Sequence, residues 1–184
     1  MDIPVFKYHP DPLLSGSIEI SKKKCVCCKK ARGYIYTGPT YCEEDLERVI
    51  CPWCISDGTA HAKYDATFVD ESVFTDDIPA AVIEEITQRT PGYSSWQSER
   101  WLSCCRDAMA FLEPVGLTEI RRRYAGLEDK VLAGISEDLN LSQVAAGRML
   151  ESLKRDAGPT AYVFQCLRCH SYKTFVDGIF DISA

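Results

Sequence analysis

The sequence lacks any long hydrophobic run. No apolar stretch of the 184-residue chain approaches the roughly 18–20 residues of a membrane-spanning helix. The first ten residues also lack the charged and then apolar pattern of a secretion signal. Low-complexity tracts are missing too, and the 46% hydrophobic and 26% charged content is that of a globular protein. These absences predict a cytoplasmic protein that has no membrane partner.

Histidine and recognisable catalytic motifs are scarce. The chain has three histidines, and none of them lies in a His-Glu-x-x-His or nucleophile-elbow pattern. It also has no glycine-rich loop of the kind that cradles phosphate. We therefore predict no catalytic residue and favour a protein that is not an enzyme.

Positive charge is scarce in the middle of the chain. The formal net charge is −6, and it divides into +3 for residues 1–30, −8 for residues 31–103 and −1 for residues 104–184. The acidic middle segment would repel phosphate backbones, which disfavours nucleic acid as a partner, and it would attract a basic protein. The alternative is a solvated acidic face that only keeps the protein soluble.

Cysteine is abundant, with ten residues. In a reducing compartment, paired Cys-x-x-Cys motifs indicate metal binding more often than disulfides. Cys25 and Cys28 form one pair, Cys51 and Cys54 form another, and 22 residues separate the pairs. Zinc binds four thiolates at the corners of a tetrahedron, and a complete set leaves no position for water. The two pairs therefore predict a structural zinc site.

The second of these pairs has another interpretation. Cys51-Pro-Trp-Cys54 resembles a glutaredoxin-type redox pair, whose first cysteine lies exposed at a helix N-terminus. Residues 55–59 look like a poor helix start, which favours zinc. Two further cysteines, Cys27 and Cys42, are interpreted as small core or loop residues, with Cys27 pointing away from its neighbours in the first pair.

A third cysteine pair lies near the C-terminus. Cys166 and Cys169 are followed by His170, which formally matches a haem-attachment motif, but haem attachment requires export. We predict a second zinc site instead, completed by Cys104 and Cys105. Adjacent cysteines on a helix diverge by about 100°, so a set with one of them and His170 is the alternative. The expected cofactor is one or two zinc ions.

The secondary-structure pattern predicts an α+β fold. We expect an N-terminal zinc-knuckle or ribbon β region over residues 1–75, and a helical region over 76–184 that ends in a β-hairpin with a Cys-x-x-Cys knuckle. The two regions are expected to form one compact unit. The predicted elements are a strand at 33–39, a short helix or turn at 43–50, helices at 79–90, 95–112, 118–132 and 142–154, and strands at 161–166 and 171–176.

Four residues are candidates for binding a partner. Asp76 and Asp77 belong to the acidic middle segment, and Tyr93 and Trp96 flank a Pro-Gly turn. Tyrosine and tryptophan are enriched at binding hot spots. The alternative is that Tyr93 and Trp96 pack a corner between two helices.

Several motifs in fixed order resemble the CbrC family, a bacterial family named for a protein associated with tolerance to a DNase colicin. They are Tyr8-His-Pro-Asp-Pro12, Gly33-Tyr-Ile-Tyr-Thr-Gly-Pro39, Ile50-Cys-Pro-Trp-Cys-Ile55, Arg89-Thr-Pro-Gly-Tyr93 with Trp96-Gln97, and Gly158-Pro-Thr-Ala-Tyr162. The resemblance implies a small zinc-type protein of the cytosol that counters a toxin.

The resemblance and the acidic middle segment together favour one function. We expect a zinc-stabilised, non-enzymatic immunity or tolerance protein that neutralises a bacterial toxin, such as a nuclease, by direct binding. The alternatives are a zinc-dependent or thiol-redox enzyme and a zinc-ribbon adaptor of a stress response.

Overall fold

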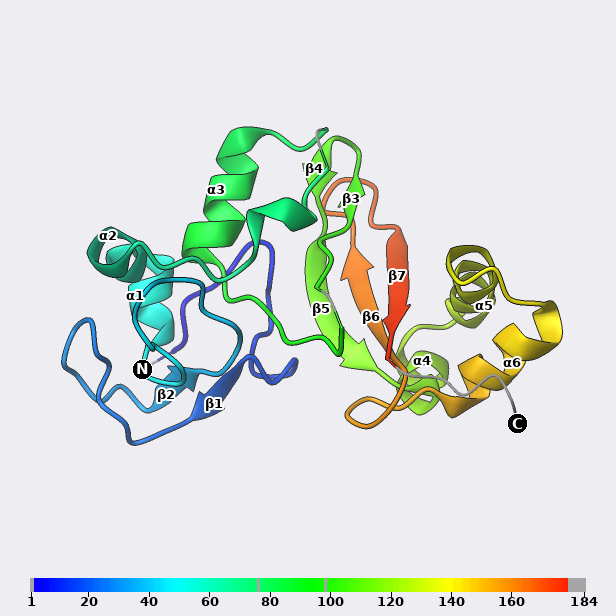
Figure 1. Ribbon diagram of the computed structural model, residues 1–184, viewed down its shortest axis with the longest axis horizontal. Coiled ribbons are helices and arrows are strands. Elements are labelled where there is room, and N and C mark those ends of the chain that lie inside the picture. The colour runs from blue at the N-terminus through cyan, green and yellow to red at the C-terminus, as the bar shows by residue number, and fades with distance from the viewer. Residues whose placement is uncertain (1, 76, 98, 179–184) are drawn as a thin grey trace.

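The computed structural model describes residues 2–75, 77–97 and 99–178 and has a mixed α+β fold. Its elements form three groups along the long axis (Figure 1). The first group comprises β1 (Ile18–Ile20), β2 (Tyr34–Tyr36), α1 (Pro52–Ser56), α2 (Thr59–Tyr64), the 3-10 turn η1 (Glu71–Val73) and α3 (Ala80–Arg89). The middle group comprises β3 (Ser103–Cys104), β4 (Asp107–Ala108), β5 (Ala110–Val115), β6 (Thr160–Gln165) and β7 (Tyr172–Asp177). The third group comprises α4 (Leu117–Arg123), α5 (Glu128–Asp138) and α6 (Gln143–Ser152).

This arrangement confirms the predicted α+β class, with cysteine pairs in both halves and a C-terminal hairpin. The hairpin is β6–β7, close to the strands expected at 161–166 and 171–176. It belongs to a three-stranded antiparallel sheet in the order β5-β6-β7. The β1–β2 and β3–β4 pairs are separate two-stranded sheets.

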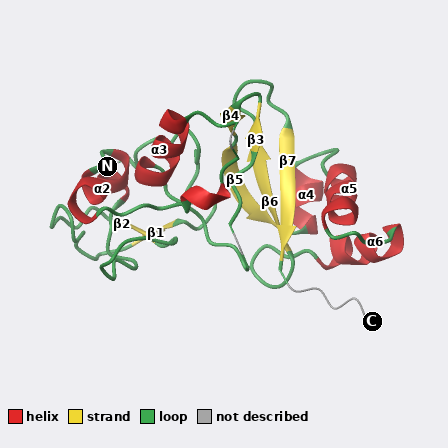
Figure 2. Cartoon of the chain, turned by 45° about the horizontal axis from the view of Figure 1, so that its top comes forward, coloured by secondary structure: helices red, strands yellow, loops and turns green. Residues whose placement is uncertain are grey.

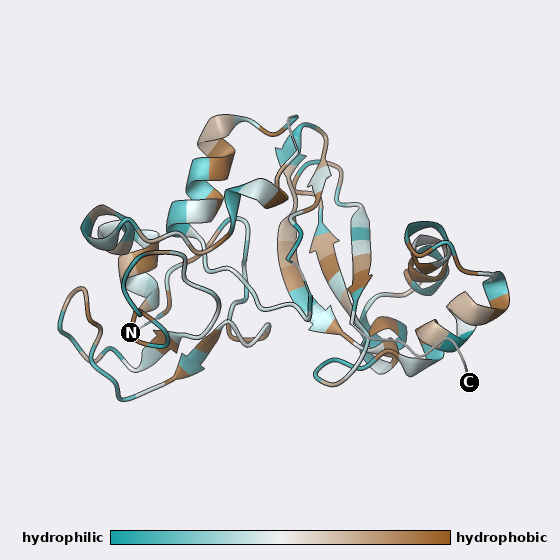
Figure 3. Cartoon of the chain, in the orientation of Figure 1, coloured by the Kyte–Doolittle hydropathy of each residue, from teal (hydrophilic) through white to brown (hydrophobic). Residues whose placement is uncertain are grey.

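The three-stranded sheet is covered on both faces, as the alternation along β6 shows. Tyr162 and Phe164 pack into a core shared with the first group, which includes Ile86 of α3. Ala161 and Val163 point to the other face and join the core formed with α4, α5 and α6. Figure 2 shows these three helices on one side of the sheet, and Figure 3 shows hydrophobic residues along the strands between the two layers.

The predicted helix at 95–112 was wrong, because this segment forms β3, β4 and the start of β5. Cys105 and Arg106 have φ angles of 54° and 57°. Two successive left-handed residues make a tight turn and cannot continue a right-handed helix. The apolar residues that suggested a helical stripe pack across this turn, where the Trp101 indole Nε1 donates to the Met109 carbonyl at 2.9 Å.

The helices predicted at 79–90 and 142–154 are confirmed as α3 and α6. The helix predicted at 118–132 is two helices, because this range covers most of α4 and the start of α5. Gly126 lies between these two helices, and its φ of 79° lets the chain turn there. Residues 43–50 form turns and bends. Of the short helix or turn that was expected there, the turn is present.

An N-terminal segment connects the first group to the sheet. The buried His9 ring donates from Nδ1 to the Pro91 carbonyl at 2.7 Å, and its Nε2 lies 2.7 Å from Ser15 Oγ. The backbone amide of Phe111 in β5 donates to the Tyr8 carbonyl at 2.8 Å. The Tyr8 hydroxyl donates to Asp107 of β4 at 2.9 Å. This segment therefore ties the N-terminal region to the β3–β4 hairpin and the sheet.

Within the described ranges, no helix has the length and apolar character needed to cross a membrane. The division into regions 1–75 and 76–184 stays a prediction, and α3 of the second region packs on α1 and α2 of the first.

Candidate metal centres

The first cysteine pair lies on a knuckle of the chain between β1 and β2. Cys25 starts the knuckle, and its carbonyl accepts the amide of Lys29 at 2.8 Å. The Cys25 amide in turn donates to the Lys30 carbonyl at 2.9 Å. Lys29 has a φ of 60°, which reverses the chain just after Cys28. This tight turn places the two thiols of the pair on the same side of the loop.

The second pair lies at the start of a helix. Cys51 is the N-cap of α1, Pro52 occupies the first helical turn, and Cys54 lies one turn further along. Proline suits this position because its missing N–H would have no partner there and its φ is already helical. Cys51 therefore lies at a helix N-terminus, although α1 already ends at Ser56 and residues 57–58 lie outside a helix. Cys51 is only 1% exposed, unlike the accessible first cysteine of a redox pair.

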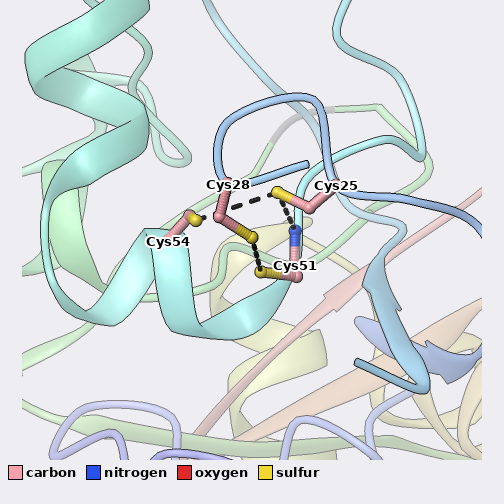
Figure 4. A group of neighbouring side chains, drawn as sticks. All are labelled: Cys25, Cys28, Cys51 and Cys54. Carbon is pink, nitrogen blue, oxygen red and sulfur yellow. Dashed lines mark hydrogen bonds between the residues drawn. The ribbon is translucent and has the colours of Figure 1, made fainter. Parts of the chain in front are cut away.

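The four thiols of Cys25, Cys28, Cys51 and Cys54 form the first cluster. Their Sγ atoms all lie within 4.8 Å of one another. The Cys25–Cys54 and Cys28–Cys51 Sγ distances are both 3.8 Å (Figure 4). Four thiolates around a zinc ion with Zn–S bonds of about 2.3 Å would be about 3.8 Å apart, whereas a disulfide requires about 2.05 Å. The spacing fits a tetrahedral metal site.

The surroundings of the first cluster are largely apolar. Three of its four cysteines are buried, and burial raises the pKa of the Cys54 thiol to about 12. A hydrogen bond to Cys25, followed by burial, raises the Cys27 pKa. Cys27 lies in the same buried core and outside the four-cysteine set. The backbone amide of Cys51 also donates to Cys25 Sγ at 3.3 Å.

The second cluster joins two hairpins that are far apart in the sequence. Cys104 ends β3, and Cys105 lies in the left-handed turn to β4. Cys166 follows β6, and its carbonyl accepts the amide of His170 at 3.0 Å. Because no helix runs through this segment, the argument that adjacent cysteines diverge does not apply. Both cysteines of the turn can reach the knuckle that contains Cys169.

The thiols of Cys104, Cys105, Cys166 and Cys169 also lie within 4.8 Å of one another. Cys104 Sγ is 3.7 Å from the Sγ atoms of both Cys105 and Cys169. Among the described residues, this set does not include His170, which is exposed and has a φ of 58°. His170 occupies the position that Lys29 holds in the first knuckle, so it turns the chain as Lys29 does.

The second cluster is more exposed than the first. Cys105 and Cys169 are exposed, Cys104 is half-buried and Cys166 is buried. Ser171 Oγ lies 3.1 Å from Cys169 Sγ, and hydrogen bonding with Ser171 lowers the Cys169 pKa to about 6. Both clusters can therefore hold a metal ion, and the donor set of four thiols suits a soft or borderline ion such as zinc.

The structure describes three of the four candidate partner-binding residues. Asp76 lies outside the described residues, and Asp77 is exposed, where it accepts the Thr75 hydroxyl at 2.5 Å. Tyr93 is 2% exposed and stacks on Phe111 with ring centroids 4.0 Å apart. Trp96 is 54% exposed. Of the two aromatic residues, Trp96 is the one that offers a surface to a partner.

An acidic cleft of about 1060 Å³ lies beside these residues, and sequence reasoning did not identify it. Its carboxylates come from three distant segments and are Glu44, Asp45, Glu47, Asp70 and Glu99. Glu99 accepts the Tyr41 hydroxyl at 2.9 Å and the Asp70 amide at 2.8 Å. Burial raises the Glu99 pKa. Only the tertiary fold brings these carboxylates together, although Glu44, Asp45 and Glu47 already appear as an acidic run in the sequence.

Comparison with known proteins places this architecture in a family. The model of an uncharacterised protein family, UPF0167, matches residues 3–178. A UPF0167 protein of Mycobacterium bovis is 43% identical over 179 residues, which cover 95% of this chain and 93% of the relative. A UPF0167 protein of Pseudomonas aeruginosa is 44% identical over 169 residues, which cover 91% of this chain and 92% of the relative. No solved structure matches the chain. With nearly its whole length matched, the chain belongs to the UPF0167 family.

Proposed function

We propose that each cluster holds one zinc ion and that the protein is a zinc-stabilised binding protein rather than an enzyme. The observation that carries the proposal is the spacing of the thiols, which is 3.8 Å across the first cluster and 3.7 Å across the second. Each cluster supplies four thiols. A catalytic zinc site keeps one coordination position open for water or substrate, so two complete sets favour structural roles.

Zinc would fix the position of the elements that carry it. In the first cluster it would join the knuckle at Cys25 to the start of α1 at Cys51. In the second it would join the β3–β4 turn to the β6–β7 hairpin. A metal ion that fixes these elements supports a binding role, because a rigid surface loses less conformational entropy when it binds a partner. With eight thiolates and two zinc ions, the formal charge would be about −10.

The partner we propose is a basic protein in the cytoplasm. The acidic cleft supports this proposal, because its five carboxylates would complement a cationic surface. The resemblance to the CbrC family makes a bacterial toxin, such as a nuclease, the partner to test first. A nuclease surface that holds phosphate is basic and would match the cleft in charge.

Metal content tests the first part of the proposal. Protein purified without chelator should contain about two zinc ions per chain by elemental analysis. A correctly folded preparation free of zinc, judged by circular dichroism and a cooperative melting transition, would overturn it. Occupancy by iron with a visible absorption band would replace the zinc assignment and leave the four-thiolate geometry intact.

Binding kinetics test the second part. The probe is a toxin domain encoded beside the gene for this protein, and the association rate should fall as salt rises. Charge reversal of Glu44 and Asp45, two exposed acids that line the cleft, to Lys should slow association while zinc content and melting temperature stay nearly unchanged. Reversal of Asp129 and Glu137, two exposed acids of α5, is the matched control and should have little effect. Equal slowing by both variants would contradict a specific acidic surface.

A further inference from the structure

The first metal knuckle carries a concentration of positive charge that the proposed function does not use. The sequence has no acidic residue between Glu19 and Glu43. Within that interval lie six cationic residues, which are Lys22, Lys23, Lys24, Lys29, Lys30 and Arg32. We call residues 22–32 the basic knuckle. It lies almost wholly in residues 1–30, whose net charge is +3, and is a local exception to the net charge of −6 over the chain.

The charge of the basic knuckle faces solvent. All five of its lysines are exposed, and the segment lies at the end of the molecule away from α5 and α6 (Figure 1). A divalent ion with four thiolates would place two negative charges inside the knuckle. Six cations exceed this number, so the knuckle keeps a clear positive excess after its own metal site is balanced.

Aromatic side chains border the knuckle on two sides. On one side, the Arg32 guanidinium lies 5.2 Å from the centre of the Trp53 ring, and the Tyr34 ring lies 6.3 Å from the same ring. Ile20 pairs with Tyr34 across β1 and β2 and is 82% exposed. This side therefore presents a half-buried indole and an exposed aliphatic residue beside a cation.

The other side of the knuckle has a second aromatic and cationic pair. The Tyr64 hydroxyl donates to the carbonyl of Val26, inside the knuckle, at 3.3 Å. The ammonium group of Lys63 lies 5.0 Å from the centre of the Tyr64 ring. Together, the two sides give a surface in which rings and cations are interleaved around a rigid turn.

This combination matches one class of ligand. Cations bind phosphates, and exposed rings stack on bases that are not already stacked in a duplex. The elements beside the knuckle are the five-residue α1 and the six-residue α2, which offer no long helix for the major groove of a duplex. We propose that the basic knuckle and its flanking aromatic residues bind single-stranded nucleic acid.

The proposal is tested by fluorescence anisotropy with the full-length, metal-loaded protein and a labelled 20-nucleotide single strand of mixed sequence. If about four phosphates are contacted, the affinity should fall about 50-fold between 50 and 200 mM salt. A duplex of the same sequence should bind at least tenfold more weakly. Equal affinity for the duplex, or no binding at 50 mM salt, would overturn the proposal.

Two variants connect the binding to this surface. Replacing Lys22, Lys23 and Lys24 with alanine should weaken binding at least tenfold and flatten the salt dependence. The matched control replaces Arg122, Lys130 and Lys154, three exposed cations of the C-terminal half, with alanine and should change affinity less than threefold. If the control weakens binding as much as the knuckle variant, the surface has been wrongly assigned.

A third variant separates base stacking from general attraction to negative charge. Trp53→Leu retains apolar packing and removes the ring, and it should weaken binding about fivefold or more at unchanged metal content. An acidic peptide such as oligoglutamate serves as the comparison probe. If it binds as tightly as the nucleic acid and Trp53→Leu has no effect on either, the knuckle binds acidic peptide in place of nucleic acid, which overturns the proposal.

Discussion

The two cysteine clusters have nearly the same geometry and very different surroundings. In both, a Cys-x-x-Cys knuckle is closed by a non-glycine residue of positive φ, Lys29 in one and His170 in the other. The first cluster is buried in its own hydrophobic core, whereas two thiols of the second are exposed. The same donor set can thus serve as the centre of a core or as a clamp on the surface.

The difference follows from what each cluster holds together. The first group has only two three-residue strands and short helices around its metal site. The second cluster joins a hairpin to a three-stranded sheet that has aromatic packing of its own, such as Tyr162 on Phe175 with ring centroids 4.9 Å apart. We therefore expect the first cluster to be required for folding, and the second to add local order.

Removing one cysteine from each cluster in turn should reveal the largest difference between the two clusters. Metal binding at a structural zinc site is worth about 10–16 kcal/mol, which exceeds the stability of most domains. Cys25→Ser should therefore unfold the N-terminal region, whereas Cys166→Ser should lower the zinc content by about one ion and leave that region folded. Elemental analysis and hydrogen exchange measure both effects. Cys42→Ser, which lies outside both clusters, is the control.

Either of two results would contradict the different roles that we expect for the two clusters. If Cys166→Ser unfolded the N-terminal region as completely as Cys25→Ser, the second cluster would not be a local clamp. If Cys166→Ser left the zinc content unchanged, its four cysteines would be ordinary thiols.

Acid should lower the stability of the folded protein through His9, which lies in the segment that connects the first group to the sheet. Burial lowers the His9 pKa to about 4, from an ordinary value of 6.5. Between these values the unfolded state binds the proton and the folded state does not, so stability falls as the pH drops from 6.5 to 4. The loss should reach about 3 kcal/mol. Urea unfolding at pH 7.5 and pH 4 measures it.

The His9→Asn variant isolates this contribution. Asparagine keeps an amide near the Pro91 carbonyl and does not titrate. Protonation of the cysteine clusters in acid affects both proteins, so the difference between them reports His9. If the variant and the original protein lose equal stability between the two pH values, His9 is not the group responsible.

Metal exchange should show a smaller difference between the clusters. Exposed Cys105 and Cys169 leave the second site open to attack by a chelator, whereas the buried first site must open before exchange. We expect two phases of zinc release in excess chelator, with rates that differ at least tenfold. The faster phase should be missing in Cys166→Ser. A single phase in the original protein would mean that burial does not control exchange here.

Much of the first cysteine cluster could be predicted from the sequence because its members are local pairs. Two Cys-x-x-Cys turns at a suitable spacing need only one reversal of the chain to meet. The strand pair around Cys166 was also predicted, because its β-branched and aromatic content is high on both sides of a knuckle. The helices at 79–90 and 142–154 carry clear starting signals, such as Ser142, whose side chain caps α6.

The segment at 95–112 could not be predicted because tertiary pairing decides its structure. Its apolar residues fit a helical period by eye, but β5 is held by pairing with β6, whose residues lie about 50 positions further along. Pro114 is tolerated in β5 because this strand lies at the edge of the sheet. Glu113 is buried in the same strand because Arg155 and Arg123 approach it at 2.7 and 2.8 Å. None of these partners is local.

The position of the second cluster in the chain has a consequence for the order of folding. Residues 29–50 separate the ligand pairs of the first cluster, whereas residues 106–165, with all three C-terminal helices, separate those of the second. Closing a loop nearly three times longer costs about 1 kcal/mol more chain entropy. The second site also forms only after β5 and β6 have paired. A metal ion bound at the first cluster would therefore nucleate folding, whereas one at the second cluster would bind only to a chain whose C-terminal half is already assembled.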